Sequence, residues 1–242
     1  MKAALLATLL LISQLAPVSA QTPARVPALK LRLGAVTVEL PTPAGFDEAA
    51  SRFERVKTFF SATEDPNNEM LAVHLPLADV ARLERNEQPE MNFYTKVSVS
   101  RRSKETSFDA SQLADLISVF EKQGLKLLDT NNPELKEKMR RAEDAANDLN
   151  KDSTLKMSAP EYLGEFDRTP NTFGVMIMAR VSIESGGQTK QVLMLCAASF
   201  VMVRSRLIYV YAYRRYDSEA DLTTLKDFAR KWSAQIVAAN RS

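Results

Sequence analysis

The residue types in this chain that could do chemistry are few. The sequence holds one histidine, His74, and one cysteine, Cys196, so a zinc site of histidine and cysteine ligands cannot be assembled. A serine–histidine–aspartate site would have to use His74, but the chain has no G-x-S-x-G motif. Its seven glycines are scattered and form no phosphate-binding loop. We therefore predict no catalytic, cofactor-binding or metal-binding residue.

Carboxylate chemistry survives this inventory, because a hydrolase can work with two acids that the fold brings together. Glu161, Glu165 and Asp167 lie close in sequence and beside aromatic residues. Nothing in the sequence distinguishes a catalytic pair among them. Cys196 stands between Leu195 and Ala197, and such surroundings are typical of a small buried core residue rather than a reactive thiol.

Aromatic side chains near loop or strand ends could instead form a contact site. Those in the expected loop 150–170 either pack beneath that loop or mark a partner surface. Aromatic area combined with charge is typical of interface hot spots. The candidate partner surface is Tyr162, Phe166, Tyr213, Arg215 and Tyr216.

Methionines offer a second kind of binding site. Flexible thioethers suit adaptable pockets for lipid or other apolar molecules between a sheet and its helices, although filling the core is their commoner role. The methionines concerned are Met157, Met176, Met178, Met194 and Met202.

The elements that must position these residues centre on residues 171–216. Turn residues at 185–187 and 204–206 divide this segment into three strands of one antiparallel sheet. The first strand alternates and should be covered mostly on one face. The second is apolar on both sides and should be central. A final helix, capped by Ser218, should cover the sheet with an apolar stripe that includes Trp232.

The domain organisation follows from composition. Residues 29–240 should form a single α+β domain, in which a helical segment at about 125–170 looks like an insertion. That insertion holds the charged helix expected at 132–149. Residues 21–28, with two prolines and no apolar period, should form a flexible lead-in.

The first twenty residues, MKAALLATLLLISQLAPVSA, have the three-part pattern of a secretory signal peptide cleaved after Ala20. Their apolar run is too short for a membrane span, and Gln21 follows the cut instead of a lipid-attachment cysteine. We therefore expect a periplasmic or secreted protein. Its formal net charge of +2 falls by one when Lys2 is removed, so it should not bind nucleic acid.

Three segments in order, VELPTPAGF, NEMLAVHLP and LIYVYAYRRYDSEADLTTLKDFARKWSAQIVAAN, resemble uncharacterised secreted bacterial proteins related to the PsbP-like fold. That fold also includes the DcrB-like envelope lipoproteins and a yeast nuclear-import factor that binds a small GTPase. The resemblance implies a mainly antiparallel sheet flanked by helices on both faces, an α/β/α sandwich. It also implies a non-enzymatic, protein-binding role, and it carries over no functional residue.

Together these observations favour a non-enzymatic binding or interaction protein of the bacterial envelope, whose partner is an envelope protein or assembly. A lipid-binding or apolar small-molecule-binding protein is the first alternative, since the methionines could line such a pocket. A carboxylate-based hydrolase is the second.

Overall fold

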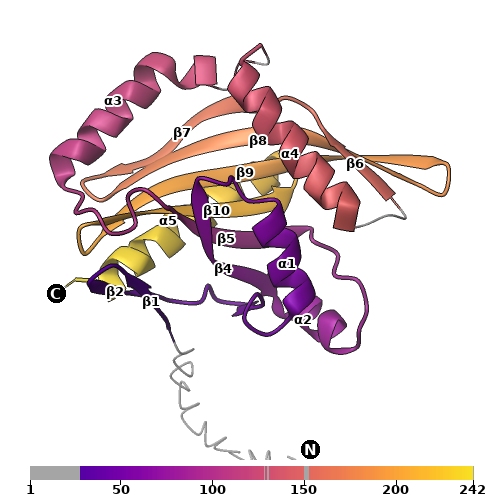
Figure 1. Ribbon diagram of the computed structural model, residues 1–242, viewed down its shortest axis with the longest axis horizontal. Coiled ribbons are helices and arrows are strands. Elements are labelled where there is room, and N and C mark those ends of the chain that lie inside the picture. The colour runs from indigo at the N-terminus through magenta and orange to yellow at the C-terminus, as the bar shows by residue number, and fades with distance from the viewer. Residues whose placement is uncertain (1–27, 128, 130, 150–152, 242) are drawn as a thin grey trace, which may run out of the picture.

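The computed structural model describes residues 28–127, 129, 131–149 and 153–241. The predicted signal peptide, and the predicted lead-in apart from residue 28, lie outside the described residues. The described chain is an antiparallel sheet with helices on both of its faces (Figure 1). This confirms the predicted α+β class.

The main sheet has eight strands. They are β3 (Phe46–Glu48), β4 (Asn68–Pro76), β5 (Phe93–Ser100), β6 (Ser153–Met157), β7 (Glu161–Thr169), β8 (Thr172–Ser185), β9 (Gln188–Val203) and β10 (Arg206–Arg215). Their order is β3-β4-β5-β10-β9-β8-β6, and β7 pairs with another part of β8. Two consecutive hairpins, β8–β9 and β9–β10, therefore form the centre of the sheet, as the sequence predicts.

The helices are α1 (Glu54–Ala62), α2 (Leu77–Glu84), α3 (Ala110–Leu127), α4 (Pro133–Leu149) and α5 (Glu219–Ala239). On one face of the sheet, Phe173, Val175 and Ala198 pack against Leu113 and Ile117 of α3. We call this side the α3 face. Figure 1 shows α3 and α4 together above it.

The opposite side, the α5 face, is closed by the last helix. There Met176, Leu195 and Ala197 pack against Leu225 and Ala229. The side chain of Leu195 on this face is fully buried, and that of Ala198 on the α3 face is also buried, so β9 has cover on both faces. The predicted central strand is confirmed.

A second, two-stranded sheet packs beside α5 and against the same face of the main sheet. It consists of β1 (Leu29–Leu33) and β2 (Val36–Leu40), which pair antiparallel. The indole Nε1 of Trp232 donates to the carbonyl of Pro41 at 2.8 Å. Trp232 is 1% exposed, because it is buried among residues of the main sheet and of this hairpin.

The expectation that β8 is covered mostly on one face is wrong for its first half. Phe173 and Val175 face α3, yet Met176 on the opposite side is also fully buried. The reason lies at Gly174, where a Cβ would come within 2.6 Å of the Phe166 ring. The missing side chain lets Phe166 of β7 fold over the α5 face, an effect that alternation alone does not reveal.

The expected loop at 150–170 is also different. Residues 153–157 and 161–169 are strands that extend the sheet beyond β8. Two irregularities in the β7–β8 register, at Tyr162/Gly164 and Glu165/Asp167, shift which face successive side chains take. They remove the period-2 pattern by which a strand is recognised. Within the described part of the chain, no helix is long and apolar enough to cross a membrane.

Candidate functional site

A row of half-buried side chains crosses five strands on the α3 face. Register places Tyr162 opposite Ile177 and Ile177 opposite Cys196, and Tyr213 then lies between Cys196 and Tyr94. We call these five residues the tyrosine row. Each keeps part of its surface exposed, although β5, β8, β9 and β10 have neighbouring strands on both sides.

Both ends of the tyrosine row are fixed by helices. The Tyr162 ring lies 5.9 Å from that of Phe120 on α3, and the Tyr94 ring lies 5.4 Å from that of Phe60 on α1. Tyr94 also stacks on Tyr213, with ring centroids 4.6 Å apart and planes 15° apart. The helices therefore pack on the two ends, while Ile177 and Cys196 in the middle remain half-buried.

An ion pair lies beside the row. Lys96 Nζ is 3.0 Å from Glu64 Oε2, and their side chains are only 12% and 7% exposed. The ammonium also lies 5.3 Å from the centre of the Tyr211 ring, a cation–π contact. Ser98 Oγ donates a further hydrogen bond to Glu64. Two charges on this mainly apolar face are thus paired with each other.

The Cys196 thiol and the phenols of Tyr211 and Tyr213 stay protonated at neutral pH. Burial raises the pKa of the Cys196 thiol to about 12. Burial also raises the pKa of Tyr211 and of Tyr213 well above the usual value, and the Glu64 carboxylate adds to this effect for Tyr211. A protonated thiol is a poor nucleophile, and a protonated phenol donates a hydrogen bond. The arrangement offers apolar area and hydrogen-bond donors, which suits binding.

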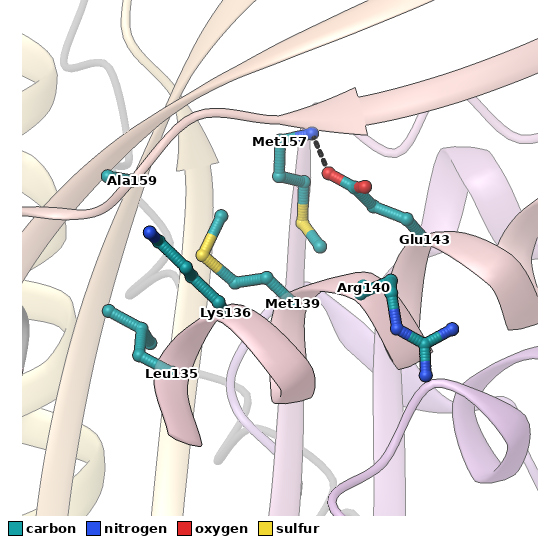
Figure 2. A pocket seen from close by; sticks show the side chains of 7 residues that line it. All are labelled: Leu135, Lys136, Met139, Arg140, Glu143, Met157 and Ala159. Atoms are coloured by element: carbon teal, nitrogen blue, oxygen red, sulfur yellow. Dashed lines mark hydrogen bonds between the residues drawn. The ribbon is translucent and has the colours of Figure 1, made fainter. Parts of the chain in front are cut away.

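A hollow of about 290 Å³ lies at the margin of the same face, between α4 and the end of β6 (Figure 2). Its lining residues are Leu135, Lys136, Met139, Arg140, Glu143, Met157 and Ala159. Figure 2 shows the thioethers of Met139 and Met157 in the space between helix and strand. The Met157 backbone N–H donates to Glu143 Oε1 at 2.5 Å.

The residues of the candidate partner surface do not lie together. Tyr162 and Tyr213 belong to the tyrosine row and are separated by Ile177 and Cys196. Phe166 is 6% exposed and packs on the α5 face, so its side chain is not available to a partner.

The other two candidates lie at the end of β10. Arg215 is half-buried and pairs with Asp217 at 2.9 Å. The Tyr216 hydroxyl donates to Glu219 at 3.0 Å. These two side chains are therefore held by acids of the adjoining turn and of the first turn of α5.

Two of the carboxylates considered for hydrolysis, Glu165 and Asp167, are engaged in local contacts. Glu165 accepts from Arg168 Nε at 2.8 Å, and Asp167 accepts from the Thr172 hydroxyl at 2.7 Å. Arg168 also holds the pKa of Glu165 below its usual value by hydrogen bonding. Among the residues that the structure describes, no group of three or more His, Cys, Asp or Glu side chains could hold a metal ion.

The methionines divide between the two faces of the sheet. Met176 and Met178 lie on the α5 face, whereas Met202 lies on the α3 face. Met194, two residues before Cys196 on the same strand, is half-buried on the α3 face. Of the methionines considered for an apolar pocket, Met176 is therefore a core residue, whereas Met194 lies beside the tyrosine row.

The sequence identifies Tyr162 and Tyr213 as candidates, but it does not predict that they lie in one row across neighbouring strands. Only the contribution of β10 could be predicted, because the alternation of Tyr209, Tyr211 and Tyr213 places these three side chains on one face of the strand. Their neighbours on the next strands depend on register, which alternation does not give.

No protein-family model matches this chain, and no curated protein matches its sequence. Among solved structures, a mutant of the protein Mog1 aligns with 89% of this chain and 93% of its own length. The TM-score is 0.29 and the sequence identity is 11%. At that TM-score the likeness supports no conclusion about this chain's residues.

Proposed function

We propose that this protein is a non-enzymatic binding protein of the bacterial envelope that holds an apolar molecule on its α3 face. The observation that carries the proposal is the tyrosine row, whose apolar side chains keep exposed surface in the middle of a sheet. An apolar ligand that covers such a surface removes it from water, which is energetically favourable. The predicted signal peptide and the resemblance to PsbP-like and DcrB-like proteins support a role in the envelope.

The chemistry of the row specifies the ligand class further. Aromatic rings and nearby thioethers suit a flexible hydrocarbon or aromatic body. Protonated tyrosine hydroxyls suit a carbonyl, ether or similar acceptor on that body. We therefore propose a lipid or another apolar molecule with at least one hydrogen-bond acceptor.

A substitution in the middle of the row tests this proposal. Ile177→Glu places a carboxylate between Tyr162 and Cys196, where it should abolish binding of anilinonaphthalene sulfonate and of palmitate. Ile183→Glu is the matched control, because it places the same charge on the same strand and face, opposite Leu155. Fluorescence titration and native mass spectrometry of the purified protein would measure both.

The expected result is binding by wild type and by Ile183→Glu, with none by Ile177→Glu. At a probe concentration of one hundred times Kd, binding should add about 2.7 kcal/mol to the free energy of unfolding. Wild-type protein that binds neither probe and carries no co-purified molecule would refute the apolar-ligand proposal.

A protein partner is the second candidate, favoured by the end of β10. Tyr213, Arg215 and Tyr216 are half-buried and close together in the chain there, and tyrosine and arginine dominate interface hot spots. A Tyr216→Ala, Arg215→Ala variant should lose a partner captured from envelope extract by wild type. Unchanged capture by the double variant would exclude this surface.

A further inference from the structure

The outer edge of β6 is bonded to side chains of a helix instead of to another strand. The Leu155 N–H donates to Asn147 Oδ1 at 2.6 Å, and Asn147 Nδ2 donates back to the Leu155 carbonyl at 3.2 Å. One turn earlier on α4, Glu143 accepts from the Met157 N–H (Figure 2). Two side chains spaced four residues apart thus satisfy three backbone groups of the strand.

These three bonds are of the kind that an added antiparallel strand would make. The amide of Asn147 presents one acceptor and one donor to Leu155, as a backbone peptide group does. Alternate residues of an edge strand direct their backbone groups outward, which agrees with bonds at positions 155 and 157. An uncovered edge of this type is a template for pairing with another chain.

The helix that covers this edge is otherwise lightly packed. Of the 17 residues of α4, only Ala146 is buried. The hollow between Met139 and Met157 leaves the first half of the helix without close packing on the strand. Lys138 pairs with Asp65 at 3.1 Å, but the two side chains are 44% and 21% exposed, and such pairs contribute little. Few buried contacts mean that local opening of α4 costs little free energy.

We propose that β6 is a latent pairing edge, that Asn147 and Glu143 keep it covered, and that withdrawal of α4 lets it pair with β6 of a second copy. The edge is self-complementary about a two-fold axis through Leu155. Antiparallel pairing would place Leu155 opposite Leu155, Ser153 opposite Met157 and Thr154 opposite Lys156. Apolar contacts meet at the centre and no like charges face each other.

Sedimentation velocity on the full chain tests this inference, which is independent of the tyrosine row. Glu143→Ala, Asn147→Ala removes the side chains that satisfy the three backbone groups and should lower the dimer dissociation constant at least tenfold relative to wild type. The matched control is Glu137→Ala, Asp144→Ala, since these carboxylates bond to Arg140 on the same helix instead. The control should sediment as wild type does.

A third variant identifies the surface. Leu155→Pro, added to the Glu143→Ala, Asn147→Ala variant, deletes an outward N–H without removing a bond to β8, because proline is tolerated where the N–H faces away from the sheet. It should restore the monomer. A dimer that persists with Leu155→Pro would overturn the inference. So would a folded double variant, by circular dichroism, whose dissociation constant equals that of the control.

Discussion

His74 shows how a residue that could do chemistry is used for structure. Its side chain is fully buried and lies edge-on to Trp232, with ring centroids 5.4 Å apart. Nδ1 is 3.1 Å from the Thr95 hydroxyl, while Nε2 has no hydrogen-bond partner among the described residues. Burial lowers the pKa of His74 to about 4, even though Glu48 and Asp47 act to raise it. The neutral ring therefore belongs to the folded state.

Stability should consequently fall in mild acid. Between pH 6.5 and about 4 the unfolded chain protonates its histidine while the folded chain does not, so the free energy of unfolding decreases as pH falls, by up to about 1.4 kcal/mol per pH unit. Urea unfolding followed by Trp232 fluorescence at pH 7 and pH 5 measures this. Because His74 is the only histidine, His74→Gln should flatten the dependence. Equal wild-type stability at the two pH values would contradict the assignment.

Gly174 is the second residue whose role is set by its neighbour. An added Cβ would come within 2.6 Å of the Phe166 ring, so Gly174→Ala should destabilise the protein by about 1–3 kcal/mol through overpacking. Urea unfolding measures the change. Phe166→Leu in the Gly174→Ala background should recover part of the loss, because the smaller side chain relieves the clash. A Gly174→Ala variant as stable as wild type would show that the ring moves freely.

At the scale of elements, the sequence predicts those whose pattern is regular. The strands β8–β10 follow from turn residues and apolar alternation. The start of α5 follows from Ser218 and Asp221, which form the capping box that the structure contains. The strand β7 could not be predicted, because its register shifts against β8 interrupt the alternation. The edge strand β6 carries a weak signal, because it has only five residues and only Leu155 and Met157 among them are apolar.

The far end of α5 gives a prediction for the smaller sheet. Asn240 Nδ2 donates to the Glu39 carbonyl at 2.7 Å, and Asn240 Oδ1 accepts from the Glu39 N–H at 2.8 Å. Asn240→Ala leaves both groups without these partners and should cost about 1–3 kcal/mol. Hydrogen exchange should become faster in residues 29–40 and stay unchanged in β9.

The exposed Gln235 on the same helix provides the control substitution, Gln235→Ala, which should leave exchange in the hairpin as it is in wild type. If Asn240→Ala also leaves it unchanged, the asparagine does not hold the hairpin to α5.

At the scale of the whole molecule, the two faces of the sheet are closed differently. The α5 face is sealed by one long helix together with the β1–β2 hairpin. The α3 face is covered piecewise by α1, α3 and α4 (Figure 1). The tyrosine row remains half-buried among them.

The sequence could not predict the tyrosine row, because β5 lies next to β10 although more than a hundred residues separate them. Sheet order, and with it the contact of Tyr94 with Tyr213, is a property of the whole fold. The apolar character of each strand could be predicted, but the row that crosses them could not.

Methyl NMR of methionine-labelled protein tests the proposed ligand site most directly, because the methionines mark both faces. On addition of palmitate, the methyl signal of Met194 on the α3 face should shift, since this residue lies two positions from Cys196. The signal of the fully buried Met176 on the α5 face should not move. Shifts confined to Met176 and Met178, or no shift at saturating palmitate, would contradict the account.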